Sequence, residues 1–293
     1  MPDLVIIQTA LDEAILRLEK SVDLDNIDER FEAELLLGFV LAKNRAFLRA
    51  FAEKALSSEQ CQRFITYIQR RCDGEPIAYI LGEREFWSFS LKVTPATLIP
   101  RPETEILVDY VLNSSYLSKK SFKEHPLRIA DLGTGSGAIA CALAYSRSHW
   151  QLDAVDFSRE ALMVAKENAR HLGLNNINFY YGSWCEPLQG FYNAIVANPP
   201  YIEDQDQHLM QGDVRFEPRT ALVSGQQGLD DIKLIISQAS AFLKSQGLLA
   251  LEHGYQQGAA VRDLFKQADF VEVQTIQDLS GQDRVTLAYY SGG

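Results

Sequence analysis

Hydrophobic side chains in the first 74 residues recur every three or four positions, the spacing that places them on one face of a helix. In the first such stretch they are Ile6, Ala10, Leu11, Ile15 and Leu18. Further stretches cover residues 31–41 and 45–54. The last helix starts with Ser57 and Gln60 in a capping-box pattern and stops at Gly74. We therefore expect four or five short helices in a small bundle.

The pattern changes between residue 79 and about residue 103. Residues 85–93 alternate apolar and polar side chains, as a strand of a hairpin does. Pro100 and Pro102 then interrupt regular structure, because each proline fixes its own φ and has no N–H to donate. We interpret residues 79–103 as a hairpin connector between a helical domain, residues 1–78, and a second domain, residues 104–293.

From residue 104 onward, short apolar runs alternate with segments of helical spacing. The runs predict strands at 127–132, 151–156, 176–181, 193–198, 247–252, 270–277 and 283–290. Helices are expected to begin near residues 104, 137, 158, 229 and 257. Such alternation is typical of an α/β fold with a doubly wound, mostly parallel sheet. A turn at Gly281 separates the last two strands, which predicts an antiparallel hairpin at one edge.

The tetrapeptide Asn198-Pro199-Pro200-Tyr201 follows a buried apolar run and indicates a rigid turn at a strand end. It offers two acceptors, the side-chain oxygen of Asn198 and the carbonyl of Pro199. Two converging acceptors suit a planar NH2 group with two N–H donors, and Tyr201 can cover its flat face. The segment therefore favours a site for a carboxamide or a nucleobase amine, although a strand followed by a plain turn would read the same way.

A second motif, Asp131-Leu132-Gly133-Thr134-Gly135-Ser136-Gly137, connects a predicted strand to a helix of small residues. Its glycines permit positive φ and close approach of a ligand, and the exposed N–H groups of the helix favour negative charge. Asp156 ends the next strand, where a carboxylate can bind two ribose hydroxyls. Together these residues predict a nucleoside-cofactor site at the carboxyl ends of parallel strands.

Two cofactors are compatible with this loop. Gly133, Gly135 and Ala138 satisfy the G-x-G-x-x-[G/A] pattern of NAD-binding proteins, with an acid about 20 residues further on. S-adenosylmethionine is favoured because the glycines alternate with other residues and because Asp131 stands two residues before the first of them. The Asn-Pro-Pro-Tyr turn also follows the fourth strand, where a methyl acceptor would lie.

The composition narrows the class of protein. The chain has 293 residues, of which 46% are hydrophobic, and this length suggests about two domains. A formal charge of −11 and a pI of about 5.0 argue against a broad basic surface, so we expect no direct binding of nucleic acid. The sequence has no membrane-length apolar run and no signal-peptide pattern, so we expect no membrane association. The cysteine and histidine spacings indicate a cytoplasmic protein with no metal.

Several segments in combination closely resemble the glutamine-N5 methyltransferases of peptide chain release factors, the PrmC/HemK type. The most particular is Thr97–Glu105, with its Ile-Pro-Arg-Pro-Glu-Thr-Glu run. The others are Glu75–Tyr79 with Gly82, Glu85–Trp87, the glycine loop 131–137, Asn198–Tyr201, Glu217–Leu222 and Asp283–Val285. The resemblance covers nearly the whole chain. It implies a helical N-terminal domain that docks the substrate protein, followed by a class I, Rossmann-like methyltransferase domain with a seven-stranded sheet.

The resemblance also implies the reaction and its residues. The methyl group of S-adenosylmethionine would pass to the glutamine of the Gly-Gly-Gln motif of release factors 1 and 2, with S-adenosylhomocysteine as product. The cofactor would be bound by Gly133, Thr134, Gly135, Ser136, Gly137, Asp156 (ribose), Trp184 (adenine) and Asn198. The glutamine amide would be held by Asn198, Pro199, Pro200 and Tyr201, with Asn198 and Pro199 as the catalytic pair. The chain departs from the family at Ser183, where an acid is common, which puts cofactor affinity in doubt.

Asn-Pro-Pro-Tyr alone would also match an adenine-N6 nucleic-acid methyltransferase, which is the alternative function. Other polar residues have a structural interpretation: Asp131 would brace the glycine loop, and Glu217 with Arg219 would order the loop after Asn-Pro-Pro-Tyr. Arg101 and Glu103 would either line the acceptor pocket or pair across the domain boundary. Glu252 and His253 sit at a strand end on the crevice side, and packing is favoured for them.

Overall fold

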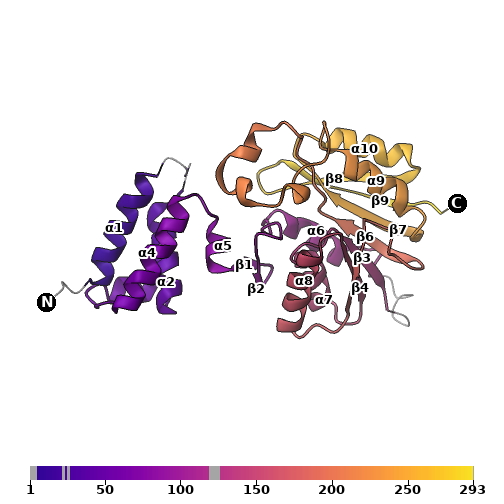
Figure 1. Ribbon diagram of the computed structural model, residues 1–293. Helices are drawn as coiled ribbons and strands as arrows, with labels where there is room; N and C mark the ends of the chain where they lie inside the picture. Colours follow the sequence, from indigo (N-terminus) through magenta and orange to yellow (C-terminus); the bar gives the residue numbers. More distant parts are fainter. Residues whose placement is uncertain (1–4, 22–23, 25–26, 119–125, 293) are drawn as a thin grey trace. The chain divides into compact units, whose positions relative to one another are not determined.

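The computed structural model describes residues 5–21, 24, 27–118 and 126–292, and the chain separates into two compact units (Figure 1). The helical unit comprises residues 1–83 together with residues 207–216. The α/β unit comprises residues 84–206 and 217–293. The segment 207–216 therefore belongs to the helical unit although both of its neighbours in sequence belong to the α/β unit, which the sequence did not indicate.

The helical unit is built from short helices around one apolar core. They are α1 (Ile7–Glu19), α2 (Glu29–Leu41), α3 (Arg45–Ala50), α4 (Ser58–Cys72) and α5 (Ile77–Leu81), with the 3-10 helices η2 (Gln207–Met210) and η3 (Gly212–Phe216). The predicted capping box is confirmed: the Ser57 hydroxyl accepts from the N–H of Gln60, and the Gln60 side chain accepts from the N–H of Ser57. Gly74 follows α4 with a φ of +89°, which only glycine adopts freely.

Arg71 connects the segment 207–216 to α4. Its guanidinium, 4% exposed, donates to both oxygens of Glu32, at 2.8 and 3.1 Å. It also donates to Asp213 in η3 at 2.9 Å and to the carbonyl of Glu75 at 3.1 Å. Arg215 adds a bond to the carbonyl of Asp73 at 3.4 Å. These polar contacts account for the position of residues 207–216 within the helical unit.

The α/β unit contains a seven-stranded sheet in the order β5-β4-β3-β6-β7-β9-β8. The strands are β3 (Arg128–Leu132), β4 (Gln151–Asp156), β5 (Ile177–Tyr181), β6 (Tyr192–Ala197), β7 (Leu243–Glu252), β8 (Phe270–Gln277) and β9 (Asp283–Tyr290). The first five in this order are parallel, and β9 is antiparallel to both β7 and β8. The predicted doubly wound, mostly parallel sheet with an antiparallel edge hairpin is confirmed.

Helices cover both faces of this sheet (Figure 1). α6 (Thr104–Asn113) and α7 (Ala138–Ser146) pack against one face, where Ile129 and Ala194 point. α9 (Asp230–Ala239) and α10 (Gly258–Gln267) pack against the other, where the next residues, Ala130 and Ile195, point. α8 (Arg159–His171) lies beside α7. Because both faces are covered, the central strands are mostly apolar on both faces rather than alternating between apolar and polar residues.

The order of the strands creates a crevice at one edge of the sheet. After β3 the chain adds β4 and β5 on one side, and then returns to place β6 and β7 on the other. The carboxyl ends of β3 and β6 therefore lie side by side where the direction of winding reverses, which is where ligands bind in such sheets. β7 begins four residues earlier than the predicted 247, because the polar residues 244–246 are exposed and carry no apolar signal.

A hairpin precedes α6 in the α/β unit. It consists of β1 (Glu83–Phe86) and β2 (Phe89–Lys92), with Trp87 in the turn at a φ of +60°. The Trp87 N–H donates to the carboxylate of Glu105 at 2.7 Å, and its indole Nε1 donates to Ser146 at 3.2 Å. Its ring packs against the α6–α7 side of the core, as expected for a core residue. The hairpin thus fixes the start of the loop that leads to α6.

Candidate active site

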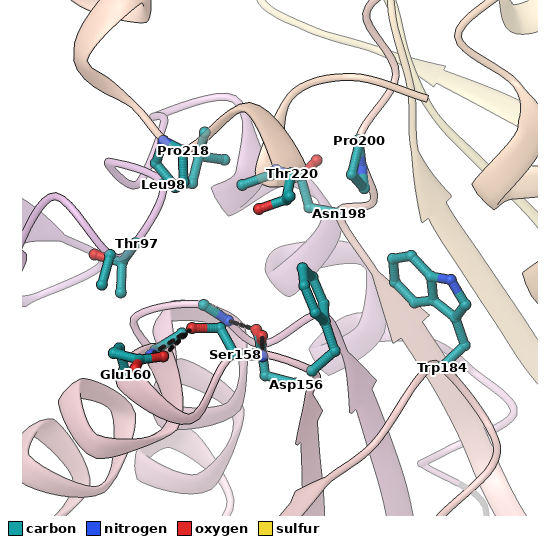
Figure 2. Close-up of a pocket in the computed structure, with 16 residues that line it drawn as sticks. Thr97, Leu98, Asp156, Ser158, Glu160, Trp184, Asn198, Pro200, Pro218 and Thr220 are labelled. Atoms are coloured by element: carbon teal, nitrogen blue, oxygen red, sulfur yellow. Dashed lines mark hydrogen bonds between the residues drawn. The ribbon is translucent and has the colours of Figure 1, made fainter. Parts of the chain in front are cut away.

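The carboxyl ends of β3, β4 and β6 face a cavity of about 310 Å³ within the α/β unit (Figure 2). It lies at the lower end of the usual size of small-molecule sites, about 300–1,000 Å³. Predicted site residues in its wall are Gly133, Gly135, Asp156, Trp184, Asn198 and Pro200. Its other lining residues had not been assigned to the site from the sequence: Ala96, Thr97, Leu98, Phe157, Ser158, Glu160, Ala161, Pro218, Thr220 and Ala221.

The glycine loop between β3 and α7 has the conformation that its sequence predicts. Gly133, Gly135 and Gly137 have φ values of +68°, +56° and +83°, a region that other residues adopt at a cost. A Cβ on Gly133 would lie 3.1 Å from the ring of Trp184, so a side chain there would push into the wall of the cavity. The loop therefore exposes main chain, rather than side chains, to the cavity.

Gly137 is expected to tolerate no side chain. It precedes α7, and a Cβ there would stand 3.1 Å from the Cβ of Ala165 and 3.3 Å from its Cα on α8. Strain at positive φ and overpacking together should make Gly137→Ala destabilising by about 2–3 kcal/mol. Gly173→Ala is the matched control, because Gly173 also has a positive φ but no described atom lies within 4 Å of its Cβ position. Denaturant unfolding should show about 1 kcal/mol for the control; equal losses would contradict the packing argument.

Asp131 holds the glycine loop through two hydrogen bonds. It is fully buried at the end of β3, and its Oδ2 accepts from the hydroxyl of Thr134 at 2.6 Å and from the N–H of Ala140 at 3.1 Å. Oδ1 has no hydrogen-bond partner among the described residues. Burial raises the pKa of Asp131 to about 7, although the two hydrogen bonds lower it. The expectation that Asp131 holds the loop rather than a ligand agrees with these contacts.

Asp156 ends β4 on the wall of the cavity. Its Oδ2 accepts from the N–H of Gly135 and its Oδ1 from the N–H of Ser158, both at 2.8 Å. Burial raises the pKa of Asp156, and these N–H groups partly offset that effect. A carboxylate has about four lone-pair directions, so each oxygen can accept a further hydrogen bond from a ligand. Ser158 also caps α8 through the N–H of Ala161 at 3.1 Å, as its sequence predicted.

Trp184 forms an aromatic wall across the cavity from Thr97 and Glu160 (Figure 2). Its main chain has a φ of +45°, and its indole Nε1 donates to Asp231 at 3.2 Å. Asp231 lies in the first turn of α9, and its own N–H donates to Ser224 at 2.8 Å. This acid orients the ring, but nothing in the local sequence around Trp184 points to it, because 47 residues separate the two.

Asn198 follows β6 on the wall opposite Asp156 (Figure 2). Its Nδ2 donates to the Oγ1 of Thr104, the first residue of α6, at 3.1 Å. In this orientation Nδ2 is directed at the threonine hydroxyl, and Oδ1 is the end of the amide that can accept a hydrogen bond from a ligand. The sequence predicted an acceptor at Asn198 but did not indicate Thr104, which is 94 positions away.

Asn198 also lines a second, smaller cavity of about 40 Å³, which is likewise lined by Gly133 and Gly135. Thr134 and Ser136 line this one, together with Arg101 and Thr104. The remaining predicted residues, Gly137, Pro199 and Tyr201, are not among the described residues that line either cavity. The carbonyl of Tyr201 accepts from Gln257 at 3.0 Å, and burial raises the pKa of its hydroxyl.

Glu217 holds the segment before α6 over the cavity. It is buried, its Oε2 accepts from the N–H of Ile99 at 3.0 Å, and its Oε1 pairs with Arg101. Both residues belong to the α/β unit, so this pair does not join the two units of the structure, and Arg101 also lines the smaller cavity. Glu217 lies in the loop after Asn-Pro-Pro-Tyr and ties it to the segment before α6, a partner segment that the sequence interpretation did not name.

Within the described ranges, no three His, Cys, Asp or Glu side chains are grouped so that they could hold a metal ion; His125 lies outside them. Across the same residues, no helix is both long enough and apolar enough to cross a membrane. Cys61, Cys72, Cys141 and Cys185 are free thiols.

Both parts of the chain are similar to known protein families. Residues 9–82 match the family described as PrmC N-terminal domain, and residues 112–216 match the family described as methyltransferase small domain. The chain is 47% identical over 280 residues to the release factor glutamine methyltransferase of Coxiella burnetii, covering 95% of this chain and 98% of that protein. The enzyme of the same name from Escherichia coli K12 is 48% identical over 281 residues, covering 96% and 97%.

A solved structure supports the fold alone. The catalytic domain of hMettl16 in complex with MAT2A 3'UTR hairpin 6 aligns with a TM-score of 0.54 at 17% identity, covering 80% of this chain and 82% of that one. Among the relatives, the release factor glutamine methyltransferase of Vibrio cholerae is 44% identical and covers 98% of this chain. Because the helical and methyltransferase parts both match, and the similarity extends over nearly the full length of both chains, the protein belongs to the release factor glutamine methyltransferase family.

Proposed function

We propose that this protein transfers a methyl group from S-adenosylmethionine to the side-chain amide nitrogen, N5, of the glutamine in the Gly-Gly-Gln motif of peptide chain release factors 1 and 2. The other product is S-adenosylhomocysteine. The observation that carries the proposal is the orientation of Asn198, whose Nδ2 is held by Thr104 while its acceptor oxygen remains for a substrate beside the cavity. The near full-length similarity to proteins named for this activity supports it.

The cavity of about 310 Å³ fits a nucleoside cofactor. The carboxylate of Asp156 would accept from the ribose hydroxyls, and the ring of Trp184 would lie against the adenine. The main chain of Gly133–Gly137 would approach the rest of the molecule, with Thr134, Ser136 and Asn198 beside it. When bound, S-adenosylmethionine supplies a methyl group on a positively charged sulfur, which makes that methyl electrophilic.

The chain's own residues act on the nucleophile, an amide nitrogen whose lone pair is delocalised. Asn198 Oδ1 and the carbonyl of Pro199 would accept from its two N–H groups, and Pro200 and Tyr201 would bound the face of the amide. These bonds fix the nitrogen in line with the methyl group and stabilise the positive charge that grows on it. Positioning contributes up to about 7–11 kcal/mol, and a preorganised polar partner about 3–4 kcal/mol. The proton leaves to water after transfer.

The alternative, an adenine-N6 nucleic-acid methyltransferase, receives less support. A formal charge of −11 opposes the broad phosphate contacts that such enzymes need. The similar structure that carries an RNA hairpin is only 17% identical, so it bears on the fold and not on the substrate.

In keeping with a release factor as partner, residues 1–78 would dock a second region of that protein, and the enzyme would work in the cytoplasm.

The test is tritiated methyl transfer from S-adenosylmethionine to purified release factors 1 and 2. A second substrate preparation carries alanine in place of the glutamine of the Gly-Gly-Gln motif. Label on the wild-type factors alone is the expected result. Label on DNA or RNA, with none on either factor, would replace the proposed function by the nucleobase alternative.

Asp156→Asn is expected to weaken binding of S-adenosylmethionine about tenfold or more, because hydrogen bonds to a charged group contribute about 1.5–3 kcal/mol. Glu160→Gln is the matched control. Glu160 is exposed on the same wall, and its Oε2 accepts from the hydroxyl of Ser158 at 3.3 Å. Isothermal titration calorimetry on the full chain gives both affinities. A larger loss for Glu160→Gln than for Asp156→Asn would reassign the ribose contact.

A further inference from the structure

Thr104 contacts the side-chain amide of Asn198 and can fix its orientation. It is the first residue of α6, 4% exposed, and its Oγ1 accepts from Asn198 Nδ2. A threonine hydroxyl has a single hydrogen. Because the oxygen already accepts from Asn198, that hydrogen must point toward a different acceptor.

Glu252 supplies an acceptor beside it. Ala197 of β6 pairs with Leu251 of β7, so the residues that follow them, Asn198 and Glu252, end neighbouring parallel strands. Glu252 is 1% exposed, and its Oε2 has no hydrogen-bond partner within the part of the chain that is described. Residues paired in register on parallel strands point their side chains to the same face, so the Glu252 carboxyl lies beside Asn198 and the Thr104 hydroxyl that Asn198 contacts. Burial raises the pKa of Glu252 to about 7, and the nearby Thr104 hydroxyl and the charge of Arg284 lower it.

Burying this carboxylate has a cost that apolar packing would avoid. An isolated buried charge is unfavourable, and replacing such groups by apolar side chains of similar volume is often neutral or stabilising. Retention of an acid that leaves one oxygen unpaired therefore needs a reason other than stability. In its ionised form Glu252 accepts hydrogen bonds and donates none, so the carboxylate directs the Thr104 hydroxyl to donate toward it and to accept from Asn198.

We propose that Glu252 and Thr104 are positioning residues for Asn198: the Thr104 hydroxyl donates to Glu252, its oxygen accepts from Asn198 Nδ2, and Asn198 Oδ1 is thereby kept available to the substrate amide. This inference rests on the proposed function, in which Asn198 accepts from the glutamine. Without the relay the Asn198 amide can turn over and present N–H donors to a substrate group that brings only N–H donors. The relay therefore acts on turnover and not on binding of the cofactor.

Two deletions test the relay in the full-length enzyme. Thr104→Val removes the hydroxyl at constant volume, and Glu252→Met removes the acceptor. Each is expected to lower kcat for release factor methylation about tenfold, the equivalent of one hydrogen bond, with KM for the release factor and affinity for S-adenosylmethionine within about twofold. Thr104→Ser and Glu252→Gln keep the donor and an acceptor oxygen, so they should retain kcat within about threefold.

The double variant Thr104→Val/Glu252→Met decides whether the two residues form one unit. Since both changes break the same relay, it should be no slower than either single variant. Losses that multiply to about a hundredfold, no rescue by Thr104→Ser, or a loss confined to KM would each overturn the proposal. Thermal unfolding identifies variants that do not fold, and Thr104→Ala and Glu252→Leu then replace them. Asn198→Ala distinguishes a failure of the relay from a failure of the proposed function. If Asn198→Ala loses turnover while the Thr104 and Glu252 variants keep it, the relay is wrong. If Asn198→Ala keeps full turnover, the proposed role of Asn198 is wrong.

Discussion

Asn198→Ala is expected to lower kcat for methylation of release factors about 10²–10³-fold, the usual effect of removing one preorganised polar partner from an active site. The change removes the oxygen that would accept from the glutamine amide, and it also frees Thr104 from its contact with Nδ2. Asp156 and Trp184 stand on other walls of the cavity, so affinity for S-adenosylmethionine should change by no more than about threefold. Steady-state transfer of tritiated methyl gives kcat, and calorimetry gives the affinity.

A control and a contrary outcome make this measurement specific. Asn175→Ala removes an exposed side chain whose amide donates to the carbonyl of Gly173 at 3.5 Å, and it should leave turnover unchanged. An Asn198 variant that loses cofactor affinity as strongly as turnover would show that Asn198 holds the cofactor rather than the acceptor. Unchanged turnover would remove Asn198 from the reaction altogether.

Much of the fold follows from local signals in the sequence. Apolar runs too short for helices marked the strands, and Ser57, Ser158 and the glycines marked where helices begin and end. Because parallel strands bring their carboxyl ends to one edge, the glycine loop, Asp156 and the turn at Asn198 could be expected at one crevice before the structure was known. Local chemistry together with a regular topology therefore predicts where a site lies.

The residues that orient the site follow no local rule. Thr104 and Asp231 contact Asn198 and Trp184 across 94 and 47 positions of sequence, and each looks like an ordinary residue of a helix's first turn. Glu252 was expected to be packing, since a lone acid at a strand end has many interpretations. Its burial, its unpaired oxygen and its place beside Asn198 on the neighbouring strand set it apart.

The position of residues 207–216 was also beyond the sequence. They follow the Asn-Pro-Pro-Tyr turn, so a loop of the α/β unit was the natural expectation, yet they form part of the helical unit. The contact responsible is the ion pair between Arg71 and Asp213, and no apolar pattern in the sequence predicts it. Gly74 was expected as a helix stop, but it also leaves room for Arg215, whose guanidinium a Cβ would overlap.

Arg71→Met is expected to destabilise the helical unit by about 3 kcal/mol. It leaves the carboxylate of Glu32, whose side chain is 14% exposed, without its bidentate partner, and it detaches Asp213 and the carbonyl of Glu75. Breaking a buried pair typically costs about 3–5 kcal/mol, and the lower end applies because the Asp213 side chain is 43% exposed. Methionine fills a similar volume, so the loss reports the polar contacts more than a cavity.

Hydrogen exchange of the full chain can isolate this unit, because amides of α2 and α4 report its opening separately from the sheet. A loss of about 3 kcal/mol corresponds to roughly hundredfold faster exchange of those amides. Arg70→Met is the matched control on the preceding residue of α4, where the partner is Glu75 and both side chains are partly exposed, at 37% and 23%. A surface pair of this kind contributes at most about 1 kcal/mol, so exchange should rise fivefold or less. Equal effects of the two variants would contradict this prediction. They would mean that the buried contacts of Arg71, including the one to residues 207–216, stabilise the unit no more than a surface pair does.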